Sequence, residues 1–116
     1  MTERYIDPVA DAKSRVTEIT PSTALGEHST DTVFLDVREP NEWNLGHIPD
    51  AVLIPLGALE DKVEEKIPHD SRVVVYCARG NRSAVAADRM QKMGYTNVAS
   101  MSEGIAGWAD AGGEIE

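Results

Sequence analysis

Short apolar runs alternate with segments of helical periodicity along the whole chain. Residues 32–36 (Thr-Val-Phe-Leu-Asp) and 72–77 (Arg-Val-Val-Val-Tyr-Cys) contain unbroken apolar runs, the pattern of strands that are buried on both faces of a sheet. Shorter β-prone stretches predict three further strands, at residues 16–19, 51–54 and 97–99. The pattern therefore predicts five short strands.

The segments between these strands have helical spacing. Leu59, Val63 and Ile67 recur every four residues and predict a helix over 56–67. A second helix is expected over 84–93, with Gly94 as its C-terminal cap. Weaker signals predict short helical segments at residues 22–27, 38–44 and 105–109. Strands that alternate with helices indicate an α/β fold, in which helices cover both faces of a parallel sheet.

A chain of 116 residues is long enough for one domain with its own core. Residues 1–15 are polar and mixed, with only a weak signal for a helical turn at 10–16, and we interpret them as an N-terminal extension. Residues 16–116 then form the domain. The N-terminus has no apolar segment of the kind that signal peptides contain, and no apolar run is long enough to cross a membrane. A cytoplasmic protein is expected.

The only cysteine of the chain, Cys77, follows a predicted strand and precedes a predicted helix. Main-chain N–H groups at such a junction point toward one spot, and the helix dipole adds positive potential there. A thiol in this setting ionises more easily, and the thiolate is a nucleophile. The alternative is a small buried hydrophobic residue. Two arginines (Arg79, Arg82) and Gly80, which tolerates a positive φ, do not suit an apolar core and favour an anion site.

The net charge of −9 makes nucleic acid a poor partner, because phosphate binding needs basic stripes. An anionic substrate must then rely on local charge from Arg79 and Arg82. One cysteine and three histidines give no metal-ligand spacing, so neither a metal nor another cofactor is expected.

Six motifs follow one another between residues 16 and 108. They are Asp36-Val37-Arg38-Glu39, Glu42-Trp43, Gly46-His47-Ile48-Pro49 with Ala51, Cys77-Ala78-Arg79-Gly80-Asn81-Arg82-Ser83, Gly94-Tyr95 and Glu103-Gly104-Ile105-Ala106-Gly107-Trp108. In this order the chain resembles a single-domain rhodanese, a sulfurtransferase. Departures are mild: Trp43 stands where the family usually has Tyr or Phe, and Ser-Glu-Gly-Ile replaces a commoner Gly-Gly form.

The resemblance implies a three-layer α/β/α rhodanese-like fold with a five-stranded parallel sheet in the order 1-5-4-2-3. It implies that Cys77 takes a sulfane sulfur from a small anionic donor, such as thiosulfate, and carries it as a persulfide. Cyanide, a thiol or a protein cysteine would then accept the sulfur. The loop residues that would bind the donor are Ala78, Arg79, Gly80, Asn81 and Arg82, with Arg82 on the oxyanion and Arg79 steering it.

Other polar residues near this loop have plainer interpretations. Ser83 is expected to cap the helix rather than to act in catalysis. Asp36 and Arg38 are expected to form a supporting ion pair at the strand end, joined by Glu42. His47 is expected to hydrogen-bond the backbone in its loop. Four large apolar side chains are assigned to the core: Leu45, Met90, Met93 and Trp108.

Two alternative functions use the same fold. Cell-cycle control phosphatases have Cys-x5-Arg, a wider loop for phosphate, whereas Cys77 to Arg82 is Cys-x4-Arg. The shorter loop also disfavours an arsenate reductase on the same fold. A phosphatase also needs an acid for the leaving group, and no loop residue supplies one. The second alternative is a non-catalytic docking module, but such modules often lack the cysteine that this chain keeps.

Overall fold

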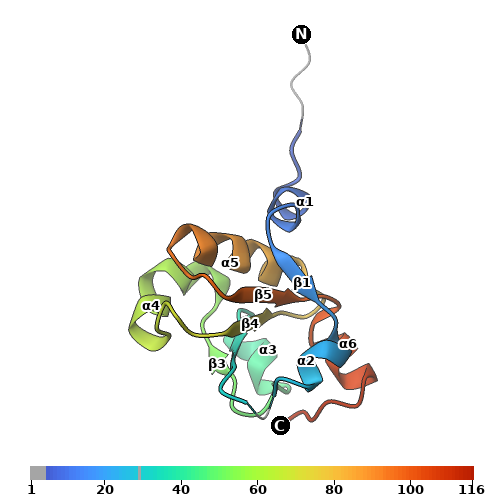
Figure 1. The fold of residues 1–116 in the computed structure, drawn as a ribbon. Coiled ribbons are helices and arrows are strands. Elements are labelled where there is room, and N and C mark those ends of the chain that lie inside the picture. Colours follow the sequence, from blue (N-terminus) through green and yellow to red (C-terminus); the bar gives the residue numbers. More distant parts are fainter. Residues whose placement is uncertain (1–4, 29) are drawn as a thin grey trace.

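The structure, a computed structural model, describes residues 5–28 and 30–116. Five strands pair in parallel in one sheet of order β1-β5-β4-β2-β3, as the resemblance implied (Figure 1). Their bounds are β1 (Thr17–Ile19), β2 (Val33–Asp36), β3 (Val52–Leu53), β4 (Val73–Tyr76) and β5 (Val98–Met101). The α/β class and the strand order are confirmed. The fifth strand runs two residues further than the sequence pattern predicted.

Helices connect the strands and cover both faces of the sheet. They are α1 (Pro8–Lys13), α2 (Pro21–Leu25), α3 (Pro40–Asn44), α4 (Leu59–Lys66), α5 (Asn81–Lys92) and α6 (Gly104–Asp110), with a 3₁₀ turn η1 (Leu56–Ala58) before α4. Figure 1 shows α4 and α5 on one side of the sheet and α2 and α6 on the other. No helix of the described part is long and apolar enough to span a bilayer.

Alternate residues of the central strands feed two separate cores. Val73 and Val75 of β4 pack with Val63 of α4 and Met90 of α5 on one face. On the other face, Val74 and Tyr76 pack with residues of α2 and α6, among them Ala24 and Trp108. All four β4 residues are fully buried, which agrees with the unbroken apolar run in the sequence. This strand therefore delivers Cys77 to the carboxyl edge of the sheet from a rigid support.

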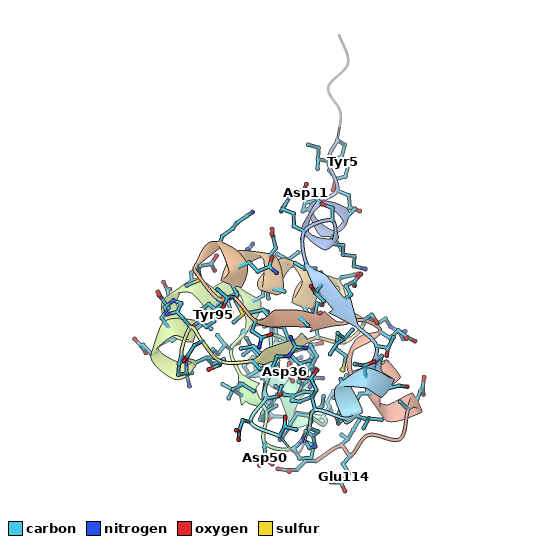
Figure 2. All side chains as sticks on the ribbon, viewed as in Figure 1. Tyr5, Asp11, Asp36, Asp50, Tyr95 and Glu114 are labelled. Atoms are coloured by element: carbon cyan, nitrogen blue, oxygen red, sulfur yellow. The ribbon has the colours of Figure 1, made fainter. Side chains whose placement is uncertain are left out.

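Helix α1 forms where the sequence signal was too weak for a helix to be predicted. Asp7 caps it by accepting the Val9 N–H, Pro8 stands at its first turn, and the helix packs on α5. Arg15 ties the segment down through an ion pair with Asp88 of α5. The pair Asp7-Pro8 is the same kind of start signal as Thr20-Pro21, which begins α2. Beyond α1, Tyr5 projects away from the sheet (Figure 2).

The assignment of Leu45 to the core is wrong. Leu45 follows the last residue of α3 and is 89% exposed. The short helix α3 has no buried residue, so the turn that follows it lies on the surface and leaves this side chain in solvent. Trp108 and Met90 are buried as predicted, and Met93 is half-buried against the α5 face of the core.

Candidate active site

Cys77 follows β4 directly, and its sulfur is enclosed by main-chain donors. Its Sγ accepts the Gly80 N–H at 3.1 Å and the Ser83 N–H at 3.4 Å. These N–H groups stand at the start of α5, so the helix dipole adds to their positive potential. Cys77 is only 1% exposed. The site is therefore a preformed cradle for negative charge on the sulfur.

Gly80 gives the cysteine loop its shape. Its φ of 96° lies in the left-handed region, which glycine tolerates. A side chain here would also crowd the segment before α6, since a Cβ atom would lie 3.2 Å from the Glu103 nitrogen. The glycine thus allows the loop to turn back over the sulfur.

The start of α6 holds the other side of the loop. The Ile105 N–H donates to the Cys77 carbonyl at 2.9 Å, and the Ala106 N–H donates to the Ala78 carbonyl at 3.4 Å. Gly104, with a φ of 58°, allows this approach. The cysteine loop is therefore fixed between two helix N-termini.

Ser83 contacts the sulfur and does not cap α5. Its Oγ lies 3.6 Å from Cys77 Sγ and 2.8 Å from Ser100 Oγ of β5. The cap position belongs to Gly80, so the capping interpretation of Ser83 is wrong. Ser100 escaped the sequence analysis because the strand was predicted to end at residue 99. Both hydroxyls are fully buried, which makes each the partner that the other needs.

Opposing influences set the pKa of Cys77. Burial, the largest of them, favours the neutral thiol and raises the pKa. Hydrogen bonds from the Ser83 side chain and from the main-chain N–H groups of Ser83, Arg79 and Gly80 stabilise the thiolate, and together they hold the pKa of Cys77 below its ordinary value. The geometry therefore favours the nucleophilic form.

The arginines of the loop differ in their surroundings. Arg82 forms a two-pronged ion pair with Glu42 of α3, at 2.7 and 2.9 Å. This guanidinium lowers the pKa of Glu42 to about 2. Arg79 is exposed and forms no ion pair among residues 5–28 and 30–116, and Asn81 is exposed in the first turn of α5. Arg79 is thus the loop cation that stays available to a ligand.

Asp36 and Arg38 form a buried ion pair at the end of β2, as expected. The Asp36 carboxylate accepts from Arg38 Nη2 at 2.7 Å and from its Nε at 3.0 and 3.1 Å. Arg38 also donates to the Gly46 carbonyl at 2.8 Å and to the Glu42 carbonyl at 3.4 Å. The Glu42 side chain, expected to join this pair, binds Arg82 instead. His47 contacts the Trp43 carbonyl through Nδ1, as predicted for a loop histidine.

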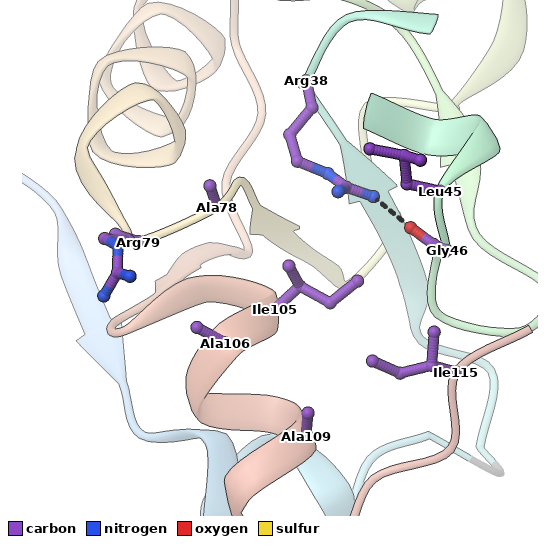
Figure 3. Close-up of a pocket in the computed structure, with 9 residues that line it drawn as sticks. All are labelled: Arg38, Leu45, Gly46, Ala78, Arg79, Ile105, Ala106, Ala109 and Ile115. Carbon is purple, nitrogen blue, oxygen red and sulfur yellow. Dashed lines mark hydrogen bonds between the residues drawn. The ribbon is translucent and has the colours of Figure 1, made fainter. Parts of the chain in front are cut away.

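A hollow of about 310 Å³ lies beside the cysteine loop. Figure 3 shows the residues that line it, which come from the end of β2, the segment after α3, the cysteine loop, α6 and the C-terminal segment. They are Arg38, Leu45, Gly46, Ala78, Arg79, Ile105, Ala106, Ala109 and Ile115. A molecule that reaches the loop from this side meets a mostly apolar surface.

Fold and site together define an α/β domain that holds a buried cysteine thiol among main-chain N–H donors at the end of its central strand. A family model described as "Rhodanese-like domain" matches residues 21–111. A "Sulfurtransferase" from Allochromatium vinosum is 38% identical over 82 residues, covering 71% of this chain and 76% of that protein. The chain belongs to the rhodanese-like domain family.

Two further proteins are similar to this chain in sequence or in structure. "Probable adenylyltransferase/sulfurtransferase MoeZ" from Mycobacterium tuberculosis is 38% identical over 77 residues, which cover 66% of this chain but only 20% of that longer protein. A solved structure from Rhodopseudomonas palustris, RPA3614, has a TM-score of 0.86 and 33% identity. It covers 100% of this chain and 99% of its own and is named "Protein of Unknown Function" and "Possible Tyrosine Phosphatase".

Proposed function

We propose that this protein is a sulfurtransferase that carries a sulfane sulfur as a persulfide on Cys77. The observation that carries the proposal is the cradle of N–H donors around Sγ, from Gly80 and Ser83 at the start of α5. Donors of this kind stabilise a thiolate before the reaction and an anionic persulfide after it. Relatives named sulfurtransferases support the same chemistry.

The proposed reaction splits the transfer into two displacements. The Cys77 thiolate attacks the outer sulfur of a donor such as thiosulfate. A bond forms between Sγ and that sulfur, the S–S bond of the donor breaks, and its electron pair leaves with sulfite. A nucleophilic acceptor, cyanide or a thiolate, then attacks the outer sulfur of the persulfide. Cys77 leaves as a thiolate, and the net charge balances in both steps.

The test is the mass of the intact protein after treatment with thiosulfate. We expect a gain of one sulfur atom, which cyanide removes as thiocyanate. Because the chain has one cysteine, prior alkylation with iodoacetamide blocks Cys77 alone and must prevent the gain. If the protein takes up no sulfur from thiosulfate, polysulfide or small-molecule persulfides, the proposal is refuted. The non-catalytic docking module is then the remaining interpretation.

Phosphatase chemistry, to which the name of the R. palustris relative points, fits this site less well. Four residues separate Cys77 from Arg82, one fewer than in the phosphatase loop. Both terminal nitrogens of the Arg82 guanidinium bind the Glu42 carboxylate rather than facing the cysteine sulfur. Hydrolysis of an aryl phosphate that iodoacetamide abolishes would reverse this preference.

Substitutions of Arg82 and Glu42 are expected to change the rate of loading by an anionic donor in opposite directions. Arg82→Ala should slow loading by thiosulfate about tenfold, because it removes a positive charge from the cysteine loop and leaves the negative charge of Glu42 without its partner. Glu42→Gln should speed it, since this change releases the guanidinium and removes a nearby negative charge. Loading rates are measured with thiosulfate and with an uncharged sulfane-sulfur donor. Equal losses with both donors in Arg82→Ala would mean that Arg82 supports loop structure only.

A further inference from the structure

Two of the large apolar side chains that the structure leaves exposed stand at the hollow beside the cysteine loop. Four are exposed in the described part of the chain. Tyr5 and Ile6 lie before α1, whereas Leu45 and Ile115, 89% and 45% exposed, both line the hollow. Ile105 of α6 lines the same hollow (Figure 3). We call Leu45, Ile105 and Ile115 the apolar mouth.

The apolar mouth adjoins the residues that hold the nucleophile. Ala78 and Arg79 line the same hollow, and the Ile105 N–H binds the Cys77 carbonyl at 2.9 Å. An acceptor whose sulfur approaches Cys77 from this side therefore lays its neighbouring groups on these aliphatic side chains. The volume of about 310 Å³ has room for a side chain of leucine size beside the acceptor sulfur.

The C-terminal segment that supplies Ile115 is held in place. Trp108 Nε1 donates to the Glu114 carbonyl at 2.8 Å, and residues 47 and 116 exchange two main-chain hydrogen bonds, at 2.9 and 3.2 Å. These bonds fix the backbone on both sides of Ile115. The Ile115 side chain is therefore held in a fixed position in the lining of the hollow.

Acidic residues adjoin the apolar mouth: Glu114 and Glu116 flank Ile115 in the sequence, and Glu103 and Asp110 line a second hollow that shares Arg79 and Ala106 with the first. The sequence contains no Lys or Arg after Lys92, but it has four acidic residues there, all exposed. They are Glu103, Asp110, Glu114 and Glu116. Of the two arginines that line the hollow, Arg38 is paired with Asp36, and Arg79 shares an adjoining hollow with Glu103 and Asp110. The four carboxylates outnumber the exposed Arg79, so a small acidic thiol would meet net repulsion at the mouth, whereas a cationic acceptor would be attracted.

We infer that the sulfur acceptor is a cysteine in a protein or peptide segment, next to a large aliphatic residue and flanked by Lys or Arg. The inference rests on the proposed sulfurtransferase function and names the acceptor class for that site. The aliphatic side chain enters the apolar mouth, and the basic residues face the acidic surface. The acceptor thiolate attacks the outer persulfide sulfur, and Cys77 is released as a thiolate.

The test follows transfer from persulfidated protein to amide-capped peptides. Loading by thiosulfate is first verified by intact mass, and rates are expressed per loaded protein. We expect the peptide Lys-Leu-Cys-Lys to accept sulfur about tenfold faster than Lys-Ser-Cys-Lys, because the leucine side chain is buried in the mouth. Lys-Leu-Cys-Lys should also accept sulfur faster than Glu-Leu-Cys-Glu at low salt. This difference in rate should shrink at about 0.5 M salt, which screens the charges.

Variants of the mouth separate docking from intrinsic thiol reactivity. Leu45→Ser and Ile115→Ser should each reduce the leucine advantage severalfold. Ile6→Ser, at an exposed isoleucine outside the hollow, should leave it unchanged. Equal rates for the leucine and serine peptides from fully loaded protein overturn the inference while the sulfurtransferase function stands. A protein that cannot be loaded by any sulfane donor overturns both.

Discussion

Cys77→Ser is expected to abolish sulfur loading completely while the fold survives. A serine hydroxyl does not ionise near neutral pH, so the variant has no nucleophile for the donor sulfur. Serine is close in size to cysteine and can use the same donors from Gly80 and Ser83. The free energy of unfolding should change by no more than about 1.5 kcal/mol.

Intact mass after thiosulfate treatment and denaturant unfolding measure the two effects separately. A Cys77→Ser protein that is folded and still gains sulfur would show that another group carries it. A second variant, Ser83→Ala, keeps the thiol and tests its activation without removing the nucleophile.

Ser83→Ala tests how the cradle activates the thiol. Hydrogen bonds from Ser83 help to hold the pKa of Cys77 below its ordinary value against the opposing effect of burial. Removing the hydroxyl makes the thiolate less stable, so the pKa of Cys77 must rise. The loading rate, which increases with pH as the thiolate forms, should then reach its midpoint at higher pH. An unchanged midpoint would mean that the main-chain donors alone set the ionisation.

Gly104→Ala is expected to damage both stability and loading. A Cβ atom at residue 104 would lie 2.4 Å from the Ala78 carbonyl carbon and oxygen and 2.5 Å from the Cys77 oxygen. The φ of 58° adds strain for alanine. Strain and overpacking together should cost about 2–5 kcal/mol, and relief of the clash must displace the cysteine loop from α6.

Gly112→Ala is the matched control for this change. Gly112 also has a positive φ, 91°, but nothing lies within 4 Å of an added Cβ atom. It should cost about 1–2 kcal/mol from backbone strain alone and leave the loading rate unchanged. Equal losses of stability and loading in the two variants would contradict the close contact at residue 104.

The sheet and the cysteine loop were predictable because their signals are local. The apolar run of β4 and the turn at Gly80 both lie within a few residues of Cys77, and the motifs around them are specific. The strand order came from the family resemblance rather than from the pattern, because pairing between distant strands leaves little local trace.

The remaining features depend on contacts between distant segments. Ser100 reaches Ser83 only because β5 pairs with β4, so that Ser100 lies opposite Val75. Arg82 and Glu42 are forty residues apart in sequence. Leu45 has a core-like identity, and only the packing around α3 reveals that nothing covers it. Helix α1 depends on its contact with α5, which short-range periodicity does not contain.

Main-chain groups, from Gly80 and Ser83, make two of the short contacts to the sulfur. A backbone donor survives exchange of its own side chain as long as the loop keeps its shape. Arg79 and Asn81 are exposed, and the hydrogen bonds of the sulfur within the described residues involve neither side chain. Libraries at these two positions would therefore vary the charge and size at the entrance while retaining the reactive centre, which makes this small domain a scaffold for redesigning sulfur-donor preference.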